Sequence, residues 1–309
     1  MSHPSTELAH DVGSRALRWL HANREYGTLS DIPDADLSAD RGAYKALGET
    51  ALAASLVLRS GAAGTTELAL ARELLTHCWE QTVNGSLLYE RLLRNPLKTD
   101  PLETYAHFTR GGFRHAELDE LLAHTVTLAS THAAEHVPNR RLGVANAVRV
   151  TGLDHGSGTP RWDALTRATW LGSTPEPWHI DWLTAYAVTH TVYHLTDWGR
   201  LPTGLPADLS GYLRDWLPAW TDVWAEAGHW DLMAELMIVE MCRTDPQVDP
   251  EDWRRLAEVQ HEDGMVPRDN QPVGDDPAQR FEDHQHPTIV AVIAGNLALA
   301  RALENPGPA

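Results

Sequence analysis

The sequence contains only two cysteines, Cys78 and Cys242, in 309 residues. Two thiols so far apart cannot supply the several disulfides that stabilise small secreted proteins, and this usage fits a reducing compartment. We expect both side chains to be small and buried, with a catalytic or ligand role as the less favoured alternative.

The sequence also has no apolar run long enough to cross a membrane. Its longest nearly apolar stretch, from Ile289 to Ala300, is interrupted by Asn296 and falls short of the roughly 20 residues that a spanning helix needs. Residues 1–7 contain neither the basic nor the apolar segment of a secretory signal. The expectation is a cytoplasmic protein without a membrane-spanning segment.

Positively charged residues are scarce. The chain has 25 Lys and Arg against 43 Asp and Glu, and its formal net charge is −18. Such a surface repels nucleic acid and anionic lipid, so we expect a small-molecule substrate and neither nucleic acid nor membrane as a partner. The oligomeric state is left open. Lys45 and Lys98 are the only lysines, and this arginine-rich composition is typical of a GC-rich, actinobacterial genome.

Several enzyme motifs are missing from the sequence. There is no P-loop, no GxGxxG dinucleotide fingerprint and no nucleophile elbow, which argues against a kinase, an NAD-dependent enzyme and an α/β-hydrolase. The hydrophobic content of 42% and charged content of 22% are ordinary for a globular protein. We expect a single domain over residues 1–309.

Strand patterns are weak, whereas helical periodicity is strong. Proline- and glycine-rich clusters divide the chain into about twelve helical segments that alternate between two kinds. The first kind is amphipathic and is expected to form an outer layer: residues 6–23, 65–82, 116–134, 161–171, 207–225 and 250–261. The second kind is apolar around most of its circumference and is expected to form an inner layer: residues 42–59, 101–110, 139–153, 180–198, 230–243 and 286–303.

This alternation predicts an all-α fold, an (α/α)6 toroid of alternating outer and inner helices, because only a helix packed on several sides can bury an all-round apolar surface. An open helical-hairpin solenoid is the alternative. The expected core residues are Met233, Met237, Ile289, Val292 and Ile293. The expected exposed residues are Arg254 and Glu258.

Two stretches resemble known helical proteins. Residues 260–264, Gln-His-Glu-Asp-Gly, and residues 286–288, His-Pro-Thr, resemble a turn and a helix start seen in α/α-toroid proteins. Residues 185–190 and the run Thr-Asp-Trp-Gly at 196–199 are similar to a signature of an uncharacterised actinobacterial all-helical family associated with specialised-metabolite genes. The resemblance implies the toroid fold. Toroids carry many chemistries, and neither the Asp-rich motif of terpene cyclases nor the zinc ligands of lanthipeptide cyclases is present.

A polar stripe on one predicted inner helix is the first candidate site. Tyr186, His190, His194 and Asp197 recur three or four residues apart and therefore share one helix face. Acid/base chemistry would make His190 the proton-transfer group and Asp197 its orienting partner. Two alternatives stay open: a structural role, with Gly199 ending the helix in a left-handed cap, and metal ligation by the histidines.

A second cluster precedes the last predicted inner helix. Pro287 suits the first position of a helix, so we expect His284 and His286 in the loop that enters it. His286 is then a second catalytic acid/base and His284 a substrate or metal ligand. A solvated loop with one capping histidine is the alternative.

Aromatic and acidic residues gather where other inner helices are expected to begin. Trp182, Tyr186, Trp230 and Asp231 are the candidate substrate-binding residues, although tryptophans at helical spacing also occur in cores. Two carboxylates in apolar surroundings, Glu235 and Glu240, are additional acid/base candidates unless an arginine such as Arg149 neutralises them.

These patterns lead to three hypotheses about function. The first is an enzyme of specialised metabolism, a lyase, isomerase, cyclase or hydrolase, in which His190, Asp197 and His286 converge on one Trp-lined cavity. The second is a metalloenzyme with zinc, copper or iron held by His190, His194 and His284. The third is a non-catalytic scaffold that binds a ligand or partner. The expected cofactor is therefore none or a single metal ion.

Overall fold

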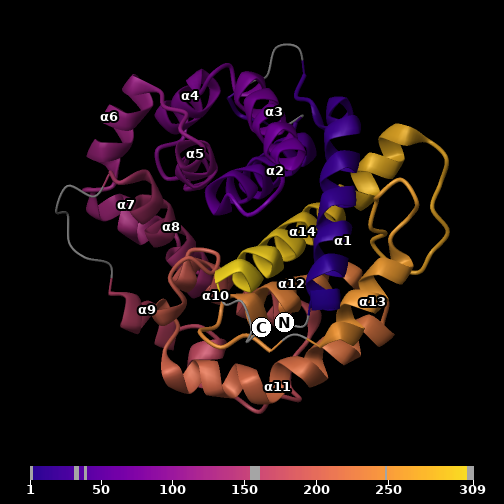
Figure 1. Cartoon of the computed structure of the whole chain (residues 1–309). Coiled ribbons are helices and arrows are strands. Elements are labelled where there is room, and N and C mark those ends of the chain that lie inside the picture. The colour runs from indigo at the N-terminus through magenta and orange to yellow at the C-terminus, as the bar shows by residue number, and fades with distance from the viewer. Residues whose placement is uncertain (1–2, 31–34, 38–39, 154–160, 248, 305–309) are drawn as a thin grey trace.

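The described residues of the protein, in a computed structural model, are 3–30, 35–37, 40–153, 161–247 and 249–304. Within these ranges the chain forms α-helices and three short 3-10 helices, and no strand. The prediction of an all-helical fold is confirmed. Figure 1 shows the helices following one another around the molecule until α14 lies beside α1.

Six helices form an inner ring. Each contacts the next along the chain, and the last contacts the first, so the contacts close into a cycle. All twelve residues of α12 are buried, as the apolar pattern of that segment predicts. The ring consists of α2 (Arg41–Ser60), α5 (Asp100–Arg110), α8 (Pro138–Thr151), α10 (Trp182–Thr196), α12 (Trp230–Met241) and α14 (Pro277–Glu304).

The remaining helices pack around this ring. They are α1 (His3–Ala22), α3 (Thr65–Gln81), α4 (Ser86–Arg94), α6 (Ala116–Thr125), α7 (Ala129–Ala134), α9 (Trp162–Arg167), α11 (Ala207–Glu226) and α13 (Pro250–Val259). The 3-10 helices are η1 (Arg24–Gly27), η2 (Leu171–Ser173) and η3 (Pro202–Gly204). The expected core residues, Met233, Met237, Ile289, Val292 and Ile293, are buried, and Arg254 and Glu258 are exposed. Cys78 and Cys242 are buried free thiols, as expected.

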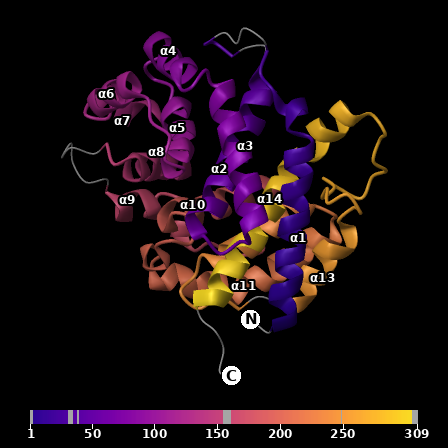
Figure 2. The same cartoon turned by 45° about the horizontal axis from the view of Figure 1, so that its top comes forward.

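The outer helix α1 and the inner helix α14 cross (Figure 2). Gly13 and Gly295 face each other where the helices meet. A Cβ atom on Gly295 would lie 2.5 Å from the carbonyl oxygen of Ala9 and 2.8 Å from Cα of Gly13. Real Cβ atoms essentially never approach backbone so closely, so this crossing requires glycine at 295.

The predicted start of the last inner helix is wrong. The helix begins at Pro277, where Asp276 caps it by accepting a hydrogen bond from the Gln279 amide at 2.9 Å. Pro287 lies inside the helix, which tolerates the one backbone hydrogen bond that proline removes. His284 and His286 are therefore helical residues and not loop residues.

Two predicted outer helices are shorter than expected. The segment 116–134 is divided into α6 and α7, and 161–171 is reduced to α9 followed by η2. At the break after α6, the Thr127 hydroxyl donates to the His124 carbonyl and the Thr131 hydroxyl donates to the Thr125 carbonyl, both at 2.7 Å. Such side-chain bonds compete with the helical backbone bonds and end the helix.

One described helix, α14, is long and apolar enough to cross a membrane by length and composition alone. Of its most apolar window, 67% is buried inside the fold. That burial is typical of a core helix in a soluble protein, and it is compatible with the absence of a membrane-spanning segment expected from the sequence.

Candidate active site

A cavity of about 250 Å³ lies inside the ring and is lined by residues from all six inner helices. Among its lining residues, the side chains of Arg140 (49%), His286 (27%), Glu103 (25%) and Glu49 (24%) are partly exposed. Arg140 and Glu103 lie in the first turns of α8 and α5, so the cavity is accessible where these two inner helices begin. Solvent can therefore reach the interior of the ring.

His286 of α14 is held in this cavity by carboxylates from two other helices. Its Nδ1 lies 3.0 Å from Glu49 Oε2 on α2, and its Nε2 lies 3.8 Å from both Asp231 Oδ2 and Glu235 Oε1 on α12. Burial alone would lower the pKa of His286, but the hydrogen bond and charge of Glu49 outweigh it and raise this pKa to about 9. His286 is therefore an imidazolium at neutral pH.

Two carboxylates, Glu49 and Glu235, line the cavity beside His286, and their pKa values are shifted in opposite directions. Burial favours the protonated form of Glu49, yet the hydrogen bond and charge of His286 prevail and lower the pKa of Glu49. Burial prevails at Glu235, whose pKa is raised although His286 lies nearby. The Thr189 hydroxyl donates to Glu235 Oε2 at 2.5 Å. One carboxylate is therefore ionised as the partner of His286, and the other retains a proton more readily.

His190 of α10 lines the same cavity in a different hydrogen-bonding state. Its Nδ1 lies 2.8 Å from the carbonyl oxygen of Tyr186, an acceptor, so Nδ1 carries a proton. In the neutral ring Nε2 is then an acceptor, which is the state that a general base needs. The cavity thus joins a protonated histidine and a histidine of fixed tautomer.

Tyr186 and Asp231 form the support behind these histidines. The Tyr186 hydroxyl donates to Asp231 Oδ2, and the Tyr186 ring contacts that of Trp182 edge-on. Burial, followed by the charge of Asp231, raises the pKa of Tyr186, so its hydroxyl stays protonated. Neither residue is among those that line the cavity, and Asp231 Oδ2 lies 3.8 Å from His286 Nε2.

Two more histidines, His107 and His194, line the cavity. Burial and then the neighbouring Arg110 lower the pKa of His107, while burial, His190 and Arg140 lower that of His194 to about 3. Both rings are therefore neutral at physiological pH. His194 shares the cavity with His190, and their ring centroids are 6.1 Å apart.

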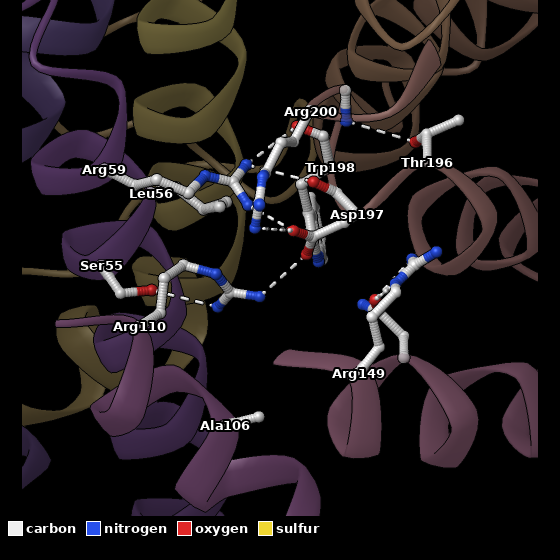
Figure 3. Close-up of polar contacts among 12 residues, drawn as sticks. Ser55, Leu56, Arg59, Ala106, Arg110, Arg149, Thr196, Asp197, Trp198 and Arg200 are labelled. Carbon is white, nitrogen blue, oxygen red and sulfur yellow. Dashed lines mark hydrogen bonds and ion pairs between the residues drawn. The ribbon is translucent and has the colours of Figure 1, made fainter. Parts of the chain in front are cut away.

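Asp197 does not orient His190. It follows α10 in a left-handed conformation, with φ of 45°, and Trp198 continues this conformation before Gly199. Its carboxylate accepts hydrogen bonds from Arg59 at 2.8 Å and Arg110 at 3.1 Å, as Figure 3 shows. The expected partnership with His190 is wrong because these two arginines saturate the carboxylate beyond the cavity wall.

Three other predicted site residues also lie outside the cavity. His284 is buried, and its Nδ1 accepts a hydrogen bond from the Arg268 amide at 3.1 Å, which anchors the preceding loop. Trp230 is a core residue whose indole donates to Asn270. Trp182 is 56% exposed on the surface. The structure therefore does not bring His284 together with His190 and His194.

Within the part of the chain that the structure describes, no cluster of three or more His, Cys, Asp or Glu side chains is arranged to hold a metal ion.

The arginine that neutralises Glu240 is not Arg149, the one suggested by the sequence. Glu240 is paired with Arg243 at 2.6 Å, whereas Arg149 donates to the carbonyl of His194 at the end of α10.

The sequence analysis missed several cavity residues, among them Glu49, Glu103 and Arg110. Each is a charged residue on a predicted inner helix. That same signal singled out Glu235 and would have found all three. It was overlooked because an isolated charge in a helix resembles a solvent-facing residue until the neighbouring helices are known.

Comparison with known proteins identifies the family of this chain. A family described as a domain of unknown function (DUF6895) matches residues 13–296, a span that contains every residue lining the cavity. No curated protein and no solved structure matches the chain. The match covers most of the sequence, and the chain therefore belongs to the DUF6895 family.

Proposed function

We propose that the protein is an enzyme that catalyses proton transfer on a small molecule bound inside the helical ring. One observation carries the proposal: His190 and His286 line the same cavity, and their surroundings give them opposite roles. An imidazolium can donate a proton while an imidazole with a free acceptor nitrogen accepts one. Isomerisation, cyclisation, elimination and hydrolysis all need such a pair.

The roles follow from the contacts of each ring. His286 is the acid, because Glu49 and Glu235 favour its charged form until the pH approaches about 9. His190 is the base, because the bond from Nδ1 to the Tyr186 carbonyl leaves Nε2 as the acceptor. Glu49 and Asp231 are positioning residues that fix the His286 ring.

The alternatives have less support. A metal site with His190, His194 and His284 would need His284 to leave its bond to the Arg268 amide. A non-catalytic scaffold would be favoured by a ring interior sealed with side chains, whereas this interior holds a cavity of about 250 Å³ with charged groups in its wall. Buried groups with perturbed pKa values in a cleft are typical of catalytic sites.

We further propose that the closed cycle of inner helices is the inner layer of an (α/α)6 toroid. A cytoplasmic enzyme of actinobacterial specialised metabolism remains the wider setting that we propose from the sequence.

The experiment is to incubate the protein with fractionated small-molecule extracts in D2O and to follow masses and deuterium incorporation by mass spectrometry. We expect wild-type protein to convert or deuterate at least one compound, and His190→Gln and His286→Gln to lose this activity. The matched control is His21→Gln, which removes a histidine–glutamate contact of 2.6 Å on the outer helices. If all four proteins are folded and leave identical spectra, the proposal is wrong.

A further inference from the structure

Glu103 of α5 and His194 of α10 meet over the backbone of α8 in the cavity wall. A Cβ atom on Gly143 would lie 3.0 Å from His194 Nε2 and 3.2 Å from Glu103 Oε2. Both atoms therefore border the same small space beside Gly143, and all three residues line the cavity. An oxygen atom on the cavity side of Gly143 can bridge the two side chains with two hydrogen bonds. No hydrogen bond or ion pair joins the two side chains directly among the contacts of the described residues.

One oxygen of the Glu103 carboxylate accepts hydrogen bonds from protein side chains, and the other lies near His194. Oε1 accepts a hydrogen bond from the Thr99 hydroxyl at 2.7 Å and another from Arg140 at 3.3 Å. Oε2 is the atom next to Gly143. Burial raises the pKa of Glu103 despite the charge of Arg140, so this carboxyl group accepts protons more readily than an exposed one.

The ring of His194 has a defined proton position. Its Nδ1 is buried without a hydrogen-bond partner among the described residues. A buried N–H without an acceptor is rarer and costlier than an unused acceptor nitrogen, so the proton of the neutral ring belongs on Nε2. Nε2 is therefore a donor that points to the same place as Glu103 Oε2.

A donor and an acceptor at this spacing select a particular chemical group. An ammonium group has no lone pair to accept from His194, and a carboxylate or phosphate dianion has no proton to donate to Glu103. A hydroxyl group accepts one hydrogen bond and donates another. We propose that Glu103, His194 and Gly143 form a subsite for one hydroxyl group, either of the substrate or of a water molecule that reacts with it.

The use of this subsite in catalysis rests on the proposed function, because the subsite lines the same cavity as His190 and His286. The existence of the subsite does not depend on that function. Gly143 is needed because a methyl group there would press against both polar atoms. Those atoms are the ends of flexible side chains, so the Gly143→Ala protein should fold while its subsite is displaced. The matched control is Gly211→Ala in α11, where a Cβ would meet nothing within 4 Å.

The decisive test is a high-resolution crystal structure of the wild-type and Gly143→Ala proteins at neutral pH. We expect an ordered oxygen within hydrogen-bonding distance of both His194 Nε2 and Glu103 Oε2 in the wild type and its loss in the variant. Long-range ¹⁵N–¹H spectra should place the His194 proton on Nε2. A direct Glu103–His194 contact, an empty gap or a proton on Nδ1 would overturn the inference, whether or not any activity is found.

Activity distinguishes the two sources of the hydroxyl. With a substrate from the D2O experiment, Gly143→Ala and Glu103→Gln should each lower kcat/KM by about ten- to hundredfold, the cost of one lost buried hydrogen bond, while Gly211→Ala leaves it unchanged. Incorporation of ¹⁸O from labelled water identifies water as the bound group, and a matching loss with the deoxy substrate identifies a substrate hydroxyl. Unchanged kcat/KM in both subsite variants would refute the use of the subsite in catalysis, which is the part of the inference that rests on the proposed function.

Discussion

His286 Nδ1 and Glu49 Oε2 lie 3.0 Å apart although the two residues are separated by 237 positions in the sequence. Glu49 belongs to the first inner helix and His286 to the last. The contact therefore joins the first and last inner helices in the wall of the cavity. A single interaction thus contributes both to ring closure and to the charge state of the proposed catalytic acid.

We predict that Glu49→Gln reduces stability in a pH-dependent way. The pKa of His286 is raised from 6.5 to about 9 in the folded state, so its stabilising contribution is fully present below pH 6.5 and is lost as the pH rises through 9. The lowered pKa of Glu49 makes its contribution present above 4.5 and lost as the pH falls below that value. Urea unfolding should show a deficit of about 1–2 kcal/mol near pH 6.5 that shrinks by pH 10. A deficit independent of pH would contradict this account.

Asp197→Asn should destabilise the fold strongly. Asparagine tolerates the left-handed conformation at this position, so the substitution mainly removes the charge. Arg59 and Arg110 would then be buried without their counter-ion, which typically costs about 3–5 kcal/mol. The control is Asp208→Asn, whose pair with Arg167 lies on the surface and should change the unfolding free energy little. Equal losses of unfolding free energy in the two variants would show that the buried ion pairs of Asp197 stabilise the fold no more than the exposed pair of Asp208 does.

The helical architecture follows from the sequence because the burial of a helix determines where its apolar residues recur. A helix buried on one face repeats them every three or four positions, whereas a helix buried on all sides is apolar at most positions. The alternation between amphipathic and all-round apolar segments predicted a helix in each of the six segments whose contacts close into a cycle, although the last of these helices begins earlier than expected, at Pro277. It also predicted that His190 and His286 reach one cavity, since inner helices distant in sequence face the same central space. Local spacing was sufficient for these conclusions.

The partners of these residues depended on distant helices and could not be predicted from spacing. Asp197 shares a helical interval with His190, but Arg59 and Arg110 reach it from two other helices. The His-Pro sequence at 286–287 predicts a helix start and therefore a loop at His284 and His286, whereas the Asp-Pro pair at 276–277 is the true start. Proline alone does not distinguish a helix start from a tolerated interior position.

Gly295→Ala should weaken the contact between α1 and α14. The added methyl group would overlap the Ala9 carbonyl oxygen, and backbone cannot move aside as a flexible side chain can. Overpacking of this kind costs about 1–3 kcal/mol or more, although alanine is the better helix former. Thermal unfolding should show the loss, with Gly211→Ala unchanged or slightly stabilised. A stabilised Gly295→Ala protein would mean that the two helices are not so closely packed.

Asp252→Asn should stabilise the protein above neutral pH. Burial, followed by the charge of Asp249, raises the pKa of Asp252 from 3.8 to about 6. Its folded state therefore favours the protonated form, and stability declines as the pH rises through 6. The variant should exceed wild type by about 1–2 kcal/mol at pH 8 and match it near pH 3. Glu258→Gln, an exposed change in the same helix, serves as the control and should show no such pH dependence.

His190→Gln separates a catalytic histidine from a structural one. The wild-type ring uses Nδ1 to bond the Tyr186 carbonyl, and the glutamine amide can donate to that acceptor, so we expect little change in helicity or melting temperature. Glutamine cannot accept a proton at neutral pH, and loss of a general base typically costs about 10²–10⁴-fold in rate. The measurement is turnover per folded molecule on the compound found in the D2O experiment, with circular dichroism on the same samples. A variant that melts early yet keeps its turnover would assign His190 to the fold, and His286 would then need another proton acceptor.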